Sequence, residues 1–330
     1  MRWILLLIAV FGTGTARADW HEATEPIMGT RVHAELWLDD PAAAERLLQR
    51  VMDEMRRIDA AFSPYIETSE LSALNRDAPK GWVDVSDELF DLLVKSRKVS
   101  ELTGGAFDIT YASVGRYYDY RKGQRPDAAL IRKAVEAIDY HYVELDAAHK
   151  RVRFSHPMVY VDLGGIAKGY AVDLCIGILQ AAGVEHASVS AGGDTRIIGD
   201  HRGAPWTVGI RDPRHAGELV AVLPLLDTAV STSGDYERFF EADGVRYHHI
   251  IDPGTGDSAR KSWSVTILGP DATLTDGLST SVFVLGPERG LELINRLPGI
   301  DAIIVDASGQ LRYSADLAQM LPPAAADDTP

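Results

Sequence analysis

The sequence holds a single cysteine, Cys175, among its 330 residues. One cysteine cannot form an intramolecular disulfide, and it cannot supply the clustered thiolates of a structural zinc or iron–sulfur site. Cys175 stands in an apolar stretch with helical spacing, so we expect a small buried core side chain there. The disulfide-stapled and cysteine-metal classes of protein are therefore excluded.

Basic residues are scarce relative to acidic ones. The chain has 33 Lys and Arg against 48 Asp and Glu, which gives a formal net charge of −15. An acidic chain repels phosphate backbones and anionic lipid surfaces, so nucleic acid and anionic membranes are poor partners for it. An anionic ligand would need a local cation or backbone amides in order to bind.

Apolar runs long enough to span a bilayer are also missing. At the N-terminus, Arg2 precedes a short apolar stretch over 3–11, and the small-residue sequence "ARA" ends at Ala18. This arrangement is typical of a secretory signal peptide. We therefore expect cleavage after Ala18 and export of the remaining chain without a membrane span.

Several familiar catalytic signatures do not occur. There is no GxGxxG after a first strand, no HExxH and no GxSxG. The sequence "GGIAKG" at 164–169 departs from the Walker spacing because glycine follows the lysine. Rossmann dehydrogenases, P-loop ATPases, zincins and α/β-hydrolases are accordingly disfavoured.

What the sequence does contain is a mixture of helices and short strands. Apolar residues at helical spacing predict helices over 41–62, 86–104, 127–138, 167–181, 276–285 and 288–296, the second of them capped by Ser86. Short alternating segments predict a hairpin over 142–154 and further strands between 186 and 269 and between 302 and 314. Antiparallel strands mixed with helices, without a regular βαβ alternation, indicate an α+β fold.

Glycine-rich polar clusters stand at the ends of several predicted strands. The most pronounced is "VDLGGIAKGYAVD" at 161–173, where Asp162, a glycine pair and Lys168 occupy a predicted strand-to-helix junction. Glycine allows close approach of the backbone to a ligand, and a helix N-terminus attracts anions, so the cluster suggests a phosphate-bearing ligand. The other clusters are "MGT", "GGAFDIT", "AGGD", "STSGDYERF", "HHIIDPGTG" and "TDGLST", and each alone is ordinary turn chemistry.

Asp276 and Thr280 are four residues apart at a predicted helix start, so they share one helical face. A carboxylate and a hydroxyl near a free backbone carbonyl form a hard-oxygen site that suits Mg²⁺, and the turn at Gly164 and Gly165 could supply the carbonyl. The alternative is that Thr275 or Asp276 merely caps the helix. In the same way His248 and His249 alternate across a strand, so one of them can be a plain core residue.

Taken in order, these motifs resemble the ApbE family of FAD:protein FMN transferases over about Met28 to Gly286. The resemblance implies an α+β fold related to the T-fold, with mixed, mainly antiparallel sheets and flanking helices. It implies one domain over 19–321, between the signal peptide (1–18) and a disordered tail (322–330). Many members of the family are lipoproteins, but the signal region here has no cysteine, so a soluble periplasmic form is expected.

The resemblance also implies an activity and a set of site residues. FMN would pass from FAD to a threonine or serine hydroxyl of a target protein, and AMP would be released. The FAD contacts fall on Met28, Tyr65, Ala106, Phe107, Asp108, Asp162, Lys168 and Ile251. The Mg²⁺ ligands fall on the carbonyl of Gly165 and the side chains of Asp276 and Thr280, and the catalytic residues on His249 and Asp276.

Several alternatives remain open at this level. His249, Asp252 or Asp276 could accept the proton of the acceptor hydroxyl, and we favour His249 as base or orienter. The partners expected are FAD and a target protein of the FMN-binding-domain or redox-pump-subunit type, and the enzyme would be a monomer or dimer. Rival functions are an FAD pyrophosphatase in which water replaces the protein hydroxyl, a non-enzymatic periplasmic FAD carrier, and a structural domain without ligand.

Overall fold

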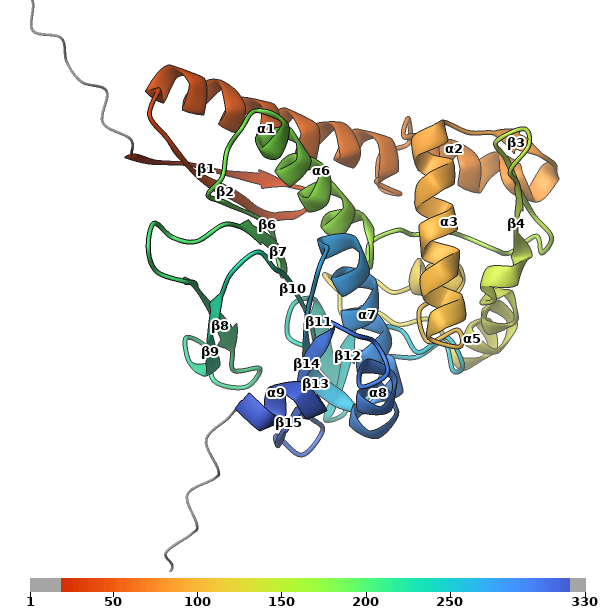
Figure 1. The fold of residues 1–330 in the computed structure, drawn as a ribbon. Coiled ribbons are helices and arrows are strands. Elements are labelled where there is room, and N and C mark those ends of the chain that lie inside the picture. Colours follow the sequence, from red (N-terminus) through yellow and green to blue (C-terminus); the bar gives the residue numbers. More distant parts are fainter. Residues whose placement is uncertain (1–18, 321–330) are drawn as a thin grey trace, which may run out of the picture.

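The computed structural model describes residues 19–320, and a large sheet forms its centre (Figure 1). Its eight strands are, in spatial order, β1 (Asp19–Ile27), β2 (Thr30–Leu38), β6 (Ala187–Ala191), β7 (Asp194–Ile198), β10 (Ala229–Gly234), β13 (Ser262–Gly269), β14 (Asp301–Asp306) and β15 (Leu311–Tyr313). Every neighbouring pair is antiparallel. The predicted α+β class is confirmed, whereas the predicted signal peptide and tail fall outside the described residues.

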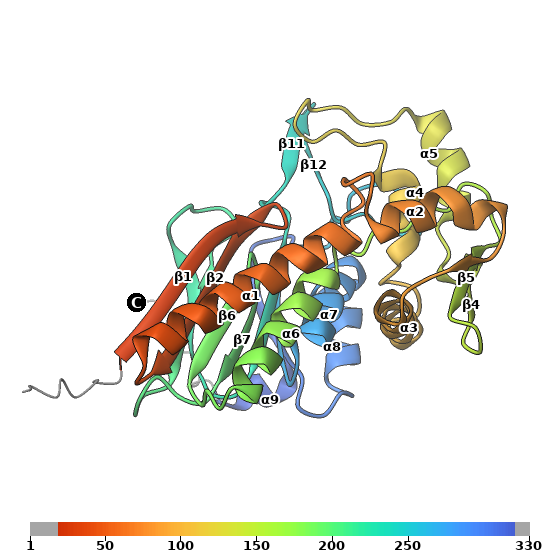
Figure 2. The same ribbon diagram turned by 90° about the horizontal axis from the view of Figure 1, so that it is seen from above.

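Three helices, α1 (Pro41–Phe62), α6 (Ala167–Ala181) and α7 (Ala272–Leu285), pack next to one another against one face of this sheet (Figure 2). The helix predicted over 41–62 is confirmed. It begins where Asp40 accepts hydrogen bonds from the amides of Ala42 (2.9 Å) and Ala43 (3.2 Å), with proline at the first helical position. Its apolar stripe, from Leu47 to Phe62, is buried against the sheet and α6.

Residues 63–166 leave the sheet after α1 and form a lobe beside the helical layer (Figure 2). Its elements are α2 (Glu70–Asp77), β3 (Val83–Asp84), α3 (Asp87–Leu102), α4 (Ala112–Gly115), α5 (Ala128–Ala134), β4 (Val143–Asp146) and β5 (Arg151–Phe154). As predicted, Ser86 caps α3, because its hydroxyl accepts from the amide of Leu89 at 3.1 Å. The chain returns to the large sheet through α6. In sequence the lobe is therefore inserted between β2 and β6 of that sheet.

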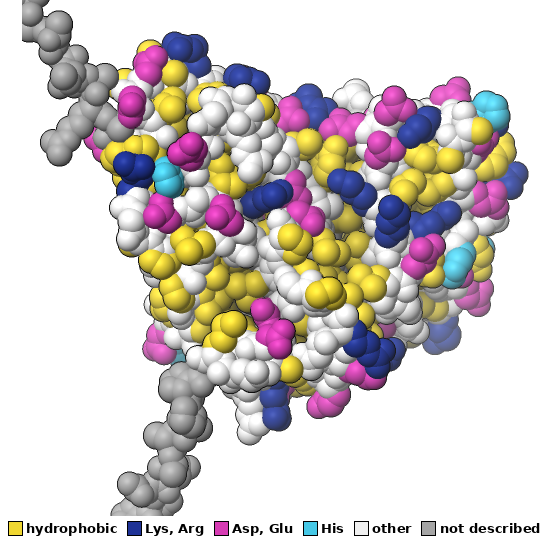
Figure 3. All heavy atoms as spheres, in the orientation of Figure 1, with side chains coloured by type: hydrophobic (Ala, Val, Ile, Leu, Met, Phe, Trp, Pro, Cys, Tyr) yellow, Lys and Arg dark blue, Asp and Glu magenta, His cyan; other side chains and the backbone are white. Residues whose placement is uncertain are grey.

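Two hairpins and two short helices complete the described chain. These are β8 (Trp206–Arg211) with β9 (Leu219–Leu225), β11 (Phe239–Ala242) with β12 (Val245–His248), α8 (Pro287–Ile294) and α9 (Ala315–Met320). Leu219, Val222 and Leu226 on and beside β9 are about half exposed, and Figure 3 shows apolar surface among interspersed charges on this face. Among residues 19–320, no helix combines the length and apolarity that crossing a membrane requires.

The predicted start of the helix at Asp276 is wrong. α7 begins four residues earlier, at Ala272, and its N-cap is Asp271, which accepts from the amide of Leu274 at 2.9 Å. Asp173 of α6 accepts from the amides of Ala272 and Thr273, so a second acid satisfies the free N–H groups of the first turn. Asp276 therefore stands in the second turn of α7 with its side chain buried, and it does not cap the helix.

Candidate functional site

Lys168, in the first turn of α6, binds two buried carboxylates. Its Nζ lies 2.5 Å from Asp194 at the start of β7 and 3.4 Å from Asp276 of α7. Both aspartates are only 2% exposed. Burial opposes the charge of Lys168, but the two carboxylates outweigh this effect and raise the pKa of the lysine. At neutral pH the cluster therefore holds a charged lysine.

The surroundings of Asp276 favour the protonated form of its carboxyl group. Burial and the neighbouring charge of Asp194 raise the pKa of Asp276, while Lys168 and the Gly169 amide, which donates to it at 3.1 Å, offset part of the rise. One lysine faces two carboxylates, so the cluster has an excess negative charge. A divalent cation with a preference for oxygen ligands would relieve this excess.

The glycine that follows Lys168 is required by the contact between α6 and α7. A Cβ at Gly169 would lie 2.1 Å from the Ala272 carbonyl oxygen and 2.9 Å from the Cβ of Asp276. Without a side chain there, the two helices approach closely enough for the Gly169 amide to reach the Asp276 carboxylate. This contact explains the third glycine of the 161–173 cluster.

The other two predicted metal ligands lie beside each other. A Cβ at Gly165 would lie 3.3 Å from the Thr280 hydroxyl oxygen, so the Gly164–Gly165 turn packs directly on the face of α7 that carries Thr280. The Thr280 hydroxyl is also 3.3 Å from that of Ser233 on β10. The glycine turn and the face of α7 that carries Asp276 and Thr280 thus come from segments more than 100 residues apart in the sequence.

The segment before this turn is not a strand, contrary to the expected strand-to-helix junction. Residues 159–163 have no strand partner. Instead the Asn75 side chain accepts from the Val161 amide at 2.7 Å and donates to the Val161 carbonyl at 2.8 Å. One buried amide side chain thus satisfies the backbone groups that a neighbouring strand would otherwise pair.

Asp162 lies near the end of this segment, shortly before the glycine turn. Its carboxylate accepts from the amide of Gly164 at 2.7 Å. Loss of solvent raises the pKa of Asp162, and the hydrogen bonds from Gly164 and Tyr111 and the charges of Arg238 and Lys168 offset part of the rise. Asp162 therefore belongs to the same electrostatic neighbourhood as Lys168.

Met28 and Tyr65, two predicted FAD contacts, come from loops. Met28 and Gly29 form the two-residue turn between β1 and β2, both with positive φ (55° and 67°), which is the geometry of a type I′ turn. A Cβ at Gly29 would lie 3.5 Å from the guanidinium of Arg238. Tyr65, in the loop after α1, is 80% exposed. Asp162 and Arg238 both act electrostatically on the Tyr65 hydroxyl, so this ring lies at the open side of the site.

The three predicted FAD contacts after α3 differ in burial and in the hydrogen bonds that they already make within the protein. Phe107 is buried, and its ring would lie 3.3 Å from a Cβ at Gly165, so it packs under the glycine turn. Ala106 packs against the core formed around α7. Burial raises the pKa of Asp108 to about 6, although its two carboxylate oxygens accept from Thr110 and from the amide of Tyr140. The Asp108 carboxylate thus holds its own loop together.

His248 and His249 separate into a core residue and a site residue. His248 Nε2 donates to the Ala259 carbonyl at 2.7 Å and Nδ1 accepts from the Ile250 amide at 3.3 Å, so both ring nitrogens are satisfied. The Nδ1 atom of His249 is buried without a hydrogen-bond partner among the described residues. Burial and the charge of Arg238 lower the pKa of His249 to about 3, so its ring is neutral at neutral pH. Ile251, the last predicted contact, is buried nearby.

Sequence reasoning missed three residues of the site. Asp194, Ser233 and Arg238 stand within clusters that the sequence singles out, "AGGD" and "STSGDYERF", but no role followed from the motifs. Arg238 makes no ion pair with a carboxylate among residues 19–320. The available signals were an acid after a glycine pair and an arginine in a polar cluster, and only the fold brings these residues to Lys168 and Asp162.

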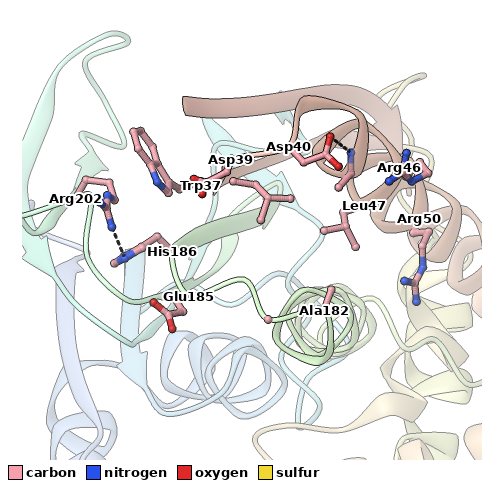
Figure 4. A pocket seen from close by; sticks show the side chains of 13 residues that line it. Trp37, Asp39, Asp40, Arg46, Leu47, Arg50, Ala182, Glu185, His186 and Arg202 are labelled. Atoms are coloured by element: carbon pink, nitrogen blue, oxygen red, sulfur yellow. Dashed lines mark hydrogen bonds between the residues drawn. The ribbon is translucent and has the colours of Figure 1, made fainter. Parts of the chain in front are cut away.

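Two other features lie away from this cluster. A groove of about 730 Å³ opens at the opposite end of α6, between the start of α1 and the α6–β6 loop (Figure 4), and none of the predicted site residues lines it. Asp212, His215 and Glu218 could together hold a metal ion, but they form an exposed turn whose members already bond to one another.

Comparison with known proteins identifies the family. The model of the ApbE family matches residues 28–304. The FAD:protein FMN transferase of Treponema pallidum is 34% identical over 92% of this chain and 89% of its own, and that of Vibrio cholerae is 33% identical over 85% and 86%.

Solved structures agree with this result. The ApbE protein of Thermotoga maritima superposes with a TM-score of 0.84 at 36% identity, covering 91% of this chain and 99% of its own. The flavin transferase ApbE of Vibrio cholerae gives 0.82 at 28% identity, covering 92% and 100%. The chain is therefore an enzyme of the ApbE family.

Proposed function

We propose that this enzyme transfers the FMN moiety of FAD to a threonine or serine hydroxyl of a target protein and releases AMP, with Mg²⁺ as cofactor. The hydroxyl oxygen forms a bond to the FMN phosphorus, and the bond from that phosphorus to the bridging oxygen of the pyrophosphate breaks. The observation that carries the proposal is the buried Lys168–Asp194–Asp276 cluster beside Thr280, in a chain whose relatives are named FAD:protein FMN transferase.

The residues present fit a magnesium ion. Mg²⁺ prefers oxygen ligands and binds through one or two carboxylates together with substrate phosphates. The Asp276 carboxylate, the Thr280 hydroxyl and the Gly165 carbonyl would hold it, next to a cluster with one carboxylate more than it has cations. When bound, the ion would offset negative charge on the transferred phosphoryl group. Lys168 would keep Asp276 and Asp194 oriented, because it contacts both.

The neutral state of His249 limits its role in the proton transfer. A group with a pKa of about 3 is a weak base at neutral pH, since general bases work best with a pKa near the operating pH. Its unpartnered Nδ1 can still form a hydrogen bond with a reactant. We infer that His249 orients the acceptor hydroxyl or the phosphate by this hydrogen bond, and that the hydroxyl proton leaves to water as the P–O bond forms.

The direct test uses the processed chain, FAD, Mg²⁺ and a purified FMN-binding-domain protein as acceptor. Intact mass should show one FMN added to each acceptor, with an equimolar amount of AMP, and no addition when the acceptor hydroxyl is removed by Thr→Val. Free FMN with AMP and an unmodified acceptor would instead indicate a pyrophosphatase. FAD binding without AMP release would indicate a carrier, and the absence of an FAD-dependent rise in Tm would indicate a domain without ligand.

We also propose that the chain is exported to the periplasm and cleaved after Ala18. Cleavage after Ala18 would keep all of the described pairing between β1 and β2, which runs from Asp19 to Leu38. The protein isolated from its native envelope should have an N-terminus near Asp19 when its terminal peptide is sequenced. An intact Met1 on that protein would contradict export.

A further inference from the structure

A basic segment lies at the open side of the site. Residues 116–125 contain four Lys or Arg and one Asp, in a chain with a net charge of −15. All four basic side chains are exposed. Lys122 and Arg125 are paired with Asp119 and Asp257, but Arg116 and Arg121 make no ion pair with a carboxylate within 19–320. The segment therefore presents uncompensated positive charge on an otherwise acidic protein.

The fold holds this segment against the site. The Tyr120 hydroxyl donates at 3.3 Å to the carbonyl of His248, which is the residue directly before His249. The Arg116 guanidinium lies 4.9 Å from the ring centres of both Tyr117 and Tyr160. The Tyr160 hydroxyl donates to the carbonyl of Pro64, the residue directly before Tyr65, at 3.5 Å. Figure 2 shows the segment between α4 and α5 running beside β11 and β12.

Exposed aromatic rings accompany these charges. Tyr65 is 80% and Tyr117 is 36% exposed, and Arg121 acts electrostatically on the Tyr65 hydroxyl. We name Tyr65, Arg116, Tyr117 and Arg121 the basic rim. Tyrosine and arginine are enriched at protein interfaces, because they combine a large contact area with polar groups that fix orientation. A rim of this composition at the mouth of a site fits a macromolecular substrate better than it fits FAD alone.

We propose that the basic rim docks the acceptor protein through an acidic surface next to its acceptor hydroxyl. This inference rests on the proposed function, because it requires a protein acceptor. Complementary charge speeds encounter and fixes the orientation of a partner. Here it would bring the hydroxyl toward the Lys168–Asp276 cluster, while the net negative charge of the rest of the enzyme would repel the same acidic surface elsewhere.

The test reverses the charge of the rim and compares it with a matched reversal elsewhere. Arg116→Glu with Arg121→Glu is compared with Arg46→Glu with Arg50→Glu, because the latter pair is also exposed and lines the groove at the far end of α6 (Figure 4). Each double variant changes the net charge equally. Acceptor KM, kcat and FAD Kd are measured with an FMN-binding-domain protein at about 50 mM and about 500 mM salt.

We expect the rim variant to raise the acceptor KM by at least about tenfold at low salt, with a much smaller rise at high salt, and the control to match the wild type. kcat and FAD Kd should stay within about twofold of the wild type. An acceptor KM equal to that of the control would overturn the proposal. An increased Kd for FAD would instead show that Arg116 and Arg121 bind FAD, which would also overturn it. If the wild-type enzyme modifies no acceptor in the same assay, the proposed function itself fails.

Discussion

Replacing Asp276 by asparagine should reduce FMN transfer by at least about 100-fold while leaving the protein folded. Asparagine retains the size of the side chain and an oxygen that accepts from the Gly169 amide, but it removes the charge that would bind Mg²⁺. The rate is measured by intact mass of the acceptor over a series of Mg²⁺ concentrations. Thr280→Val is the companion variant, and because it removes a neutral ligand its loss should be smaller and partly recovered at high Mg²⁺.

The same variant should not lower stability, because burial and Asp194 raise the pKa of Asp276. A raised carboxyl pKa means that the native state binds a proton more tightly than the unfolded state, so wild-type stability falls as pH rises above about 4. Asp276→Asn lacks this penalty, and its Tm should equal or exceed that of the wild type, with the largest gain above neutral pH. Wild-type transfer rates in Asp276→Asn, or full activity in the presence of a chelator, would rule out the proposed metal site.

Replacing Lys168 by alanine should destabilise the protein, by about 3–5 kcal/mol. Two carboxylates that are 2% exposed would lose their shared cation, and breaking a buried ion pair leaves an uncompensated charge. The sequence placed Lys168 at a helix start among the expected FAD contacts, and the two ion pairs add a structural role. The measurement is the free energy of unfolding in urea without ligand, at pH 8 and at pH 5.

The deficit should shrink at pH 5, because without Lys168 no cation offsets the repulsion between the two buried carboxylates, and protonation relieves that repulsion. Added Mg²⁺ should also recover part of the stability, since the cation can replace the lost charge. Lys168→Arg serves as the control that keeps a positive charge. A Lys168→Ala protein as stable as the wild type at both pH values would show that the lysine does not hold the two aspartates together in solution.

Local structure can be predicted from the amino-acid sequence wherever its determinants are close together in the chain. The periodicity and the Asp40–Pro41 start specify α1, and the Ser86 cap specifies the start of α3, because capping and amphipathic spacing act within a few residues. The ordered series of motifs also identified the family and, with it, the α+β fold. Neither conclusion required knowledge of which segments lie next to each other.

The contacts of Lys168 and the surroundings of α7 depend instead on long-range packing. Asp271 caps α7 locally, and Asp173, 99 residues before Ala272, binds further free amides of the first turn. Asn75 satisfies Val161 in place of a strand, and Gly169 lets α6 approach α7, so that Lys168 meets Asp194 and Asp276. These contacts join residues 26 to 108 positions apart, and local periodicity carries no information about them. The charge state of the site follows from this long-range packing, because burial and the neighbouring charges it creates shift the pKa values.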